Sequence, residues 1–296
     1  MKSIASCLLG AILLSAGLTM ATAQDAPEAT TPPPKILVID REFLKPGKGG
    51  AVHEKSESAF VQALARAKWP THYFAANSLT GKSRALFFVP YPSFAAWEQD
   101  ALAQQKNAAL SAALDRAALA DGDLLSETDA GVFTYNEDQS LRGPVDIAHM
   151  RYFEISLYRV RPGHRREWND IVKLVKVAYD KIPDAHWAVY DALYGQEDVT
   201  YLVIIPMKSA AEIDKSMEEN KQFVEAMGED GMKKLSELES SAVEFTQTNL
   251  FQFSPAMSYP PDAWVKADPD FWKPKAAAPA TAMPKTKSDE KPAAKQ

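Results

Sequence analysis

One short pattern occurs twice in this chain, a basic residue followed by Pro-Gly, and the two copies lie 116 positions apart. Pro46-Gly47 matches Pro162-Gly163, and the same interval places Pro90 on Pro206 without a gap. A chance match would not keep this register across about 100 residues. The sequence therefore predicts two copies of one unit, spanning residues 35–137 and 151–254.

The second copy shows the expected secondary structure most clearly. Phe153, Ile155 and Leu157 alternate with polar residues, which is typical of a strand with one buried face. The Pro-Gly turn ends this strand, and an apolar stripe with helical spacing then runs from Trp168 to Ile182. Two strands, a long helix interrupted near Gly228 and Gly231, and a final strand follow. This β-α-β-β-α-β order is that of a ferredoxin-like unit.

A unit of this kind carries both helices on one face of its sheet and leaves the other face uncovered. Two units in one chain can cover each other. We therefore expect an α+β protein made of two ferredoxin-like β-α-β-β-α-β repeats, packed as a pseudo-dimer within one chain.

The sequence resembles the dimeric α/β-barrel superfamily in its tandem form. The resemblance rests on the two Pro-Gly turns and on strands that end in proline, "LFFVPYPS" (86–93) and "LVIIPMKS" (202–209). It implies an intramolecular dimeric α/β barrel. The superfamily includes cofactor-free monooxygenases of quinones, haem-degrading and haem peroxidase-like proteins, isomerases, and members without a known activity, so the resemblance does not select one function.

The segments outside the two copies are each assigned a role. An apolar run that ends at Ala21–Ala23 predicts a cleaved signal peptide and export to the periplasm or the medium. A lipoprotein signal at Ile4–Cys7 is less favoured, because the apolar run follows the cysteine. The expected segments are a signal peptide (1–23), a disordered linker (24–34), a linker between the copies (138–150), an aromatic extension packing on the body (255–272) and a disordered Lys/Pro/Ala-rich tail (273–296).

Composition excludes several classes of function. Cys7, the only cysteine, lies in the predicted signal peptide, so the mature chain would hold no disulfide or cysteine metal site. The net charge is -6, although the tail from Lys273 contributes six lysines against two acids, so the body is more acidic than the whole chain. An acidic surface repels phosphate backbones, and we expect no nucleic-acid partner. No transmembrane segment is expected after signal cleavage.

The search for metal motifs gives one near miss. His53 and Glu57 are spaced to share a helix face and to hold a metal ion. A zinc-protease helix would need a second histidine at position 57, and the second copy has Asn169 and Lys173 at the matching positions. A solvated helix flank is the favoured interpretation, and no metal site is predicted.

A group of histidine and aromatic side chains near the second strand of each copy is the candidate ligand site. It consists of His72, Phe74, His186, Trp187 and Tyr190. Lining a pocket between sheet and helices, these side chains could orient or deprotonate an aromatic substrate, or one imidazole could ligate haem iron. The competing interpretation is exposed histidines and core aromatics.

Glu154 is the other candidate, on the polar side of a strand expected to lie centrally in the sheet. If it is buried there, its pKa is raised and it could act as a base or hold a ligand. If that side faces water, Glu154 is an ordinary surface residue.

Three functions follow from these expectations. The leading one is an exported barrel that binds a small apolar or aromatic molecule, with no tightly held metal or nucleotide. The second is an enzyme, either a cofactor-free monooxygenase or a haem-handling protein, that uses His186 or His72 together with Trp187 and Tyr190. The third is a structural or partner-binding protein without a ligand.

Overall fold

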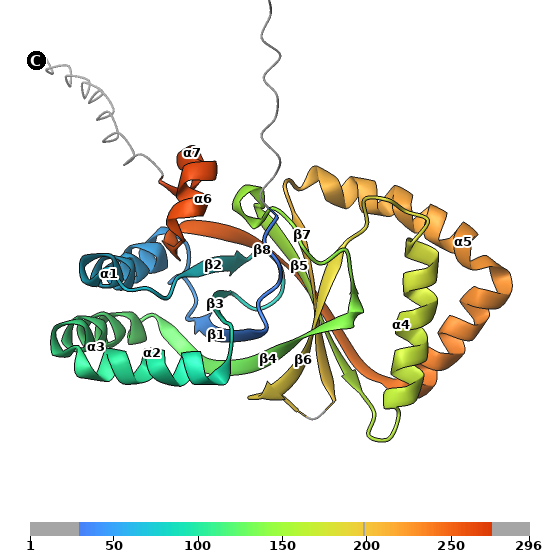
Figure 1. The fold of residues 1–296 in the computed structure, drawn as a ribbon, viewed down its shortest axis with the longest axis horizontal. Coiled ribbons are helices and arrows are strands. Elements are labelled where there is room, and N and C mark those ends of the chain that lie inside the picture. The colour runs from blue at the N-terminus through green and yellow to red at the C-terminus, as the bar shows by residue number, and fades with distance from the viewer. Residues whose placement is uncertain (1–29, 198, 274–296) are drawn as a thin grey trace, which may run out of the picture.

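The computed structural model describes residues 30–197 and 199–273, in which eight long strands and two groups of helices alternate along the chain (Figure 1). The strands are β1 (Ile36–Leu44), β2 (Tyr73–Ser78), β3 (Arg84–Tyr91), β4 (Leu125–Leu141), β5 (Tyr152–Val160), β6 (Trp187–Tyr194), β7 (Thr200–Met207) and β8 (Val243–Tyr259). The helices are α1 (Ala51–Ala67), α2 (Phe94–Lys106), α3 (Ala108–Gly122), the 3-10 turn η1 (Ile147–His149), α4 (Arg165–Tyr179), α5 (Ala211–Ala242), α6 (Asp262–Ala267) and α7 (Pro269–Trp272).

All eight strands belong to one closed barrel with the order β1-β3-β2-β8-β5-β7-β6-β4, and each neighbouring pair is antiparallel. The prediction of two ferredoxin-like repeats is therefore wrong as a description of this fold. The elements follow one another in the predicted order, but β2 pairs with β8 and β4 pairs with β6 across the middle of the chain. This pairing leaves no open sheet edge, since every edge strand finds a hydrogen-bonding partner.

The inside of the barrel is a packed aromatic core. Phe88 and Phe153 lie with ring centroids 5.4 Å apart, and Phe153 and Phe253 lie 4.6 Å apart. Side chains from both halves of the chain contribute to this one core, as the period-two alternation of β5 requires. A residual cavity of about 60 Å³ near Arg41 and Arg84 is too small for an aromatic ligand.

The helices form two groups on opposite sides of the barrel, with α1, α2 and α3 on one side and α4 and α5 on the other (Figure 1). In α4 the predicted stripe is confirmed, because Trp168, Ile171 and Ala178 are buried. The predicted interruption of α5 is confirmed at Gly228, where φ is +67°. The single helix expected before β4 is instead two helices, and the Asn107 side chain accepts a hydrogen bond from Leu110 N where the second begins.

The two Pro-Gly turns precede α1 and α4. Gly47 has φ +75° and Gly163 has φ +88°, a backbone conformation that residues other than glycine rarely adopt. The glycines of the repeated motif are thus required by the backbone conformation.

The segment after β8 returns to the barrel. Trp272 of α7 is buried and its Nε1 donates a hydrogen bond to Ala148 O at 2.8 Å, while the Trp264 ring lies 5.7 Å from Phe74. No helix among residues 30–197 and 199–273 has the length and apolar character needed to cross a membrane. The predicted signal peptide and nearly all of the predicted tail lie outside the described residues.

Candidate functional site

A cavity of about 1100 Å³ lies between the outer face of the barrel and the α4–α5 helix pair. On the strand side it is lined by outward-facing residues of β5, including Glu154, Ser156 and Tyr158, whose neighbours along the strand point into the barrel. Exposed residues of α5, such as Lys215 and Met217, line its other end, so the cavity opens to solvent there. Ligand sites for small molecules commonly occupy about 300–1,000 Å³.

The walls of this cavity are largely apolar and aromatic. The helix side is formed by Ile171, Val172, Val175 and Tyr179 of α4. Tyr179 meets Trp187 edge to face, with ring centroids 5.4 Å apart. These positions are the apolar stripe of α4, so the pattern that predicted a helix also marks the lining of the cavity.

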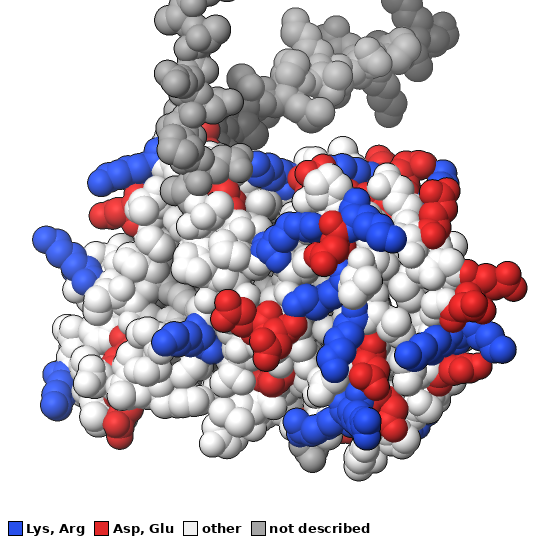
Figure 2. All heavy atoms as spheres, turned by 45° about the vertical axis from the view of Figure 1, so that its right-hand side comes forward, with Lys and Arg blue, Asp and Glu red and all other residues white. Residues whose placement is uncertain are grey.

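The outer surface on this side of the molecule carries charges of both signs. Figure 2 shows Lys and Arg side chains interspersed with Asp and Glu side chains over the face that it presents. Along α5, Lys221 Nζ lies 2.9 Å from Glu218 Oε1, and Lys215 Nζ lies 3.7 Å from Glu219 Oε1. Such pairing of opposite charges weakens any long-range field that would steer a charged ligand toward this face.

Gln139 at the end of β4 holds two tryptophans of the cavity wall. The Nε1 of Trp168 donates to its side-chain oxygen at 2.9 Å, and the Nε1 of Trp187 donates to its backbone oxygen at 3.0 Å. With both indole N–H groups paired, what these tryptophans offer a ligand is ring surface.

Glu154 is the carboxylate that the β5 strand contributes to the cavity wall. It lies on β5, which pairs with β7 on one side and with β8 on the other, as every strand of the closed barrel has two partners. Burial raises the pKa of Glu154, so the uncharged form is favoured more than it is in water. Among the described residues nothing donates a hydrogen bond to this carboxyl group, which leaves it available to a ligand.

His186 lies at the same cavity, just before β6. Its Nδ1 is 2.9 Å from Asp184 O, and its Nε2 is 2.9 Å from Pro206 O. Because both ring nitrogens face carbonyl oxygens, neither presents a lone pair toward the cavity. The arrangement does not suit His186 as an axial ligand of haem iron, which needs a free imidazole nitrogen.

The six predicted site residues are divided among three places. Glu154, His186 and Trp187 line the cavity. Phe74 and Tyr190 point into the barrel core, where Phe74 stacks on Phe88 at 4.7 Å. His72 stacks on Tyr259 at 4.6 Å in the other half of the molecule. The expected single belt therefore does not form, since β6 turns Trp187 and Tyr190 to opposite faces of the sheet.

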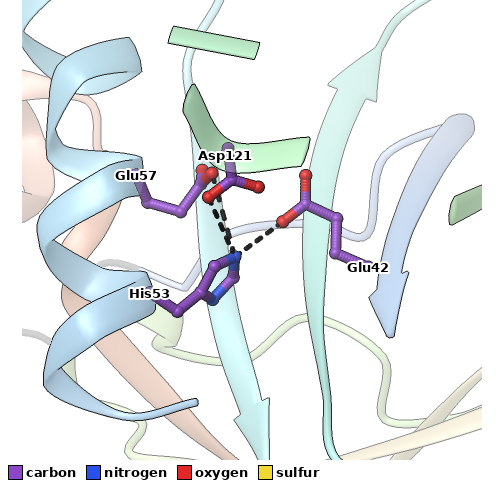
Figure 3. A group of neighbouring side chains, drawn as sticks. All are labelled: Glu42, His53, Glu57 and Asp121. Carbon is purple, nitrogen blue, oxygen red and sulfur yellow. Dashed lines mark hydrogen bonds and ion pairs between the residues drawn. The ribbon is translucent and has the colours of Figure 1, made fainter. Parts of the chain in front are cut away.

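A second group of polar side chains is buried between β1, α1 and α3 (Figure 3). His53 is 0% exposed, Glu57 3% and Asp121 1%, while Glu42 is partly exposed. The interpretation of His53 and Glu57 as a solvated helix flank is therefore wrong. Their spacing of four residues was the signal in the sequence, but Glu42 and Asp121 are distant in the chain and were not predicted as partners.

The electrostatics of this group are unusual. Burial alone would lower the pKa of His53, but the carboxylates of Asp121, Glu42 and Glu57 raise it to about 9. Burial and the neighbouring charges of Glu42 and Asp121 raise the pKa of Glu57 well above its ordinary value. Three carboxyl groups around one imidazole thus favour the binding of cations, whether protons or a metal ion.

No protein-family model and no curated protein matches this sequence. Several solved structures are similar to it. An anthrone oxidase-like protein is 12% identical with a TM-score of 0.48, over 74% of this chain and 92% of the other. A mutant chlorite dismutase from Candidatus Nitrospira defluvii is 10% identical with a TM-score of 0.44, over 79% and 95%.

A haem-binding protein from Thermus thermophilus is 14% identical with a TM-score of 0.43, over 82% of this chain and 98% of the other. With TM-scores below 0.5 the likeness carries no argument about function, which is therefore drawn from the geometry of the cavity.

Proposed function

We propose that this protein binds a small, largely apolar and aromatic molecule in the cavity between the barrel and α4–α5. The observation that carries the proposal is the cavity of about 1100 Å³ lined by tryptophan, tyrosine and branched aliphatic side chains. An apolar ligand gains about 25 cal/mol for each Å² of surface that it removes from water. Aromatic walls add ring contacts that favour a planar ligand.

Glu154 gives this site its polar contact. A carboxyl group with a raised pKa can donate a hydrogen bond when protonated and accept one when ionised. We therefore expect the ligand to carry a hydroxyl or carbonyl group at one edge of an apolar ring system. A strongly anionic ligand is disfavoured, because the acidic side chains that line the cavity, Glu154, Glu219 and Glu239 among them, outnumber the basic ones, which are Arg142, Lys208 and Lys215.

The alternative of a haem-handling enzyme has less support from the geometry, since both nitrogens of His186 face backbone oxygens. A cofactor-free monooxygenase would need a base beside the bound ring. Glu154 is the carboxylate placed for that role, so an oxygen-uptake assay on quinols with the wild type and Glu154→Gln separates this alternative from simple binding.

The binding proposal is tested with a matched pair of substitutions on α4. Val175 lines the cavity, whereas Val177 is 67% exposed on the other side of the same helix. The probe is N-phenyl-1-naphthylamine, a neutral aromatic molecule whose fluorescence rises in apolar surroundings. We expect Val175→Trp to lower its affinity at least tenfold by placing a bulky ring where the ligand would lie against α4, and Val177→Trp to leave it unchanged. Equal binding by the wild type and both variants would overturn the proposal.

We further propose that the protein performs this function after export, as the apolar run in residues 1–23 indicates. Cell fractionation and N-terminal sequencing test this directly. The expected product lies outside the cytoplasm and begins near Gln24. An intact N-terminus on a cytoplasmic protein would contradict export and leave the binding proposal unaffected.

A further inference from the structure

Four side chains that can ligate a metal ion converge on one buried point. Glu42 comes from β1, His53 and Glu57 from successive turns of α1, and Asp121 from the last turn of α3. Figure 3 shows the His53 ring directed between the three carboxyl groups. A chance acidic patch lies at the surface, whereas His53, Glu57 and Asp121 are almost completely buried here.

The spacing of the donor atoms suits a single ion. His53 Nε2 lies 2.9 Å from Glu42 Oε2, 3.7 Å from Asp121 Oδ1 and 3.9 Å from Glu57 Oε1. One donor atom from each of the four residues lies within 4.8 Å of all the others. A tetrahedral ion with bonds of about 2.0–2.2 Å holds its ligands about 3.3–3.6 Å apart. Small rotations of these side chains would therefore complete a coordination sphere.

The hydrogen bonding of the group is incomplete. Within the described part of the chain, both carboxylate oxygens of Asp121 and the Oε1 of Glu57 are buried without a hydrogen-bond partner. Buried polar atoms in folded proteins are almost always paired, and a buried carboxylate is costly unless a cation or several donors compensate it. These unpaired oxygens belong to residues of the group itself, where a bound cation would compensate them.

We propose that Glu42, His53, Glu57 and Asp121 bind one divalent first-row transition-metal ion, with Zn²⁺ as the leading ion. One imidazole and three carboxylates make a mixed nitrogen and oxygen ligand set. Imidazole disfavours Ca²⁺ and Mg²⁺, and the absence of thiolate disfavours Cu⁺. The ion reaches the site past Glu42, whose side chain is 18% exposed and is the most accessible of the four.

The site belongs to one half of the molecule. At the interval of 116 residues, Tyr158, Asn169 and Lys173 stand where the first half has Glu42, His53 and Glu57. A lysine in place of a carboxylate would repel a metal ion. The proposed metal site is therefore separate from the ligand cavity beside α4, and each can be lost without the other.

The test uses the full chain after treatment with a chelator. Co²⁺ titration followed by visible absorption reports coordination, and calorimetry with Zn²⁺ gives the stoichiometry. We expect one equivalent of either ion and little binding of Mg²⁺ or Ca²⁺. The near-isosteric variants Asp121→Asn and Glu57→Gln should weaken Zn²⁺ binding by at least about tenfold, as losses at metal sites commonly do.

A matched control is His164→Gln, because His164 is a partly exposed histidine 3.6 Å from the Glu167 carboxylate. This variant and Val175→Trp should bind Zn²⁺ as the wild type does. Circular dichroism of each variant checks that it is folded. A chelator should lower the melting temperature of the Zn²⁺-loaded wild type, and it should lower that of Asp121→Asn by less.

Two results would overturn the proposal. One is a stripped wild type that takes up neither Zn²⁺ nor Co²⁺. The other is equal binding by the wild type, Asp121→Asn and Glu57→Gln. A protein that binds no metal but is stabilised by Asp121→Asn would identify the group as a proton-sharing network instead.

Discussion

The two spaces between sheet and helices in this protein are built from similar elements but differ in content. Beside α4 and α5 the space is a cavity of about 1100 Å³ with aromatic walls. Beside α1 and α3 it is closed around His53 and its carboxylates. The outer face of the barrel beside α1 and α3 carries Ala75 and Ala85, which are both fully buried. The outer face beside α4 and α5 carries Tyr158 and Val203, which line the cavity. Side chains at the sheet–helix layer thus decide whether one kind of framework holds a cavity or a buried polar group.

The largest expected effect comes from removing the central ring of the cavity wall. Trp168 is 3% exposed and stacks on Tyr201 at 4.7 Å. Trp168→Ala should lower the free energy of unfolding by about 3–5 kcal/mol, because removal of a buried tryptophan side chain leaves a void in the packing. Urea denaturation measures it. If the two spaces are independent, Trp168→Ala keeps its Zn²⁺ binding at the group around His53. Loss of both stability and Zn²⁺ binding in this variant would show that the two spaces are coupled.

Metal removal should act on the other space alone. At free Zn²⁺ one hundred times the dissociation constant, binding to the folded state adds about 2.7 kcal/mol to the free energy of unfolding. Thermal melts with and without chelator measure this gain. Val175→Trp should keep this gain in full, and Asp121→Asn, which binds Zn²⁺ at least about tenfold more weakly, should lose about half of it or more. The same gain in Asp121→Asn would show that the stabilising ion binds elsewhere.

Gln139 sharpens the comparison on the side of the cavity. Its side chain accepts from Trp168 Nε1 at 2.9 Å and donates to Asn169 Oδ1 at 3.1 Å. Gln139→Ala leaves a buried indole N–H unpaired, so it should cost about 1–3 kcal/mol in stability. It should also weaken binding of the naphthylamine probe. Unchanged probe affinity would show that the tryptophan orientation does not matter to the ligand.

The smallest effect concerns the pH dependence of stability through Glu154. Because burial raises its folded pKa above the ordinary 4.5, the folded state binds more protons here than the unfolded state between the two pKa values. The contribution of Glu154 to the free energy of unfolding is therefore highest below pH 4.5, and it falls as the pH rises through the folded pKa. Glu154→Gln should remove that fall. The free energy of unfolding of the variant, minus that of the wild type, should therefore be larger at about pH 7 than at about pH 4. A constant difference across this range in urea denaturation would contradict it.

Much of the local structure was predictable from short-range patterns. The alternation at Phe153, Ile155 and Leu157 predicted β5, because successive strand residues face opposite sides. Gly228 interrupts α5 because its backbone has positive φ. The same alternation put Glu154 on the face of β5 opposite to Phe153 and Ile155, as the structure has it. These outcomes depend on neighbours in the chain, which the sequence displays directly.

The candidate sites were less predictable, because they depend on distant contacts. His53 and Glu57 share a helix face by their spacing, but their burial depends on Asp121 at the end of α3 and on Glu42 of β1. Trp187 and Tyr190 are three residues apart and were expected to contribute to one belt. A strand turns residues of odd separation to opposite faces, and so Trp187 lines the cavity while Tyr190 fills the barrel.

The sequence by itself determined the strands, the turns at Gly47 and Gly163 and the apolar stripe of α4, since each follows from periodicity or from a backbone conformation that only glycine adopts readily. The tertiary structure decided how the strands join. Pairing of β2 with β8 and of β4 with β6 made one closed barrel where two repeats were predicted, because unpaired edge strands have hydrogen-bonding groups that must find partners. Closure of the barrel also determined which parts of its outer surface the helices cover. That choice placed an aromatic cavity on one side of the barrel and a buried histidine with three converging carboxyl groups on the other.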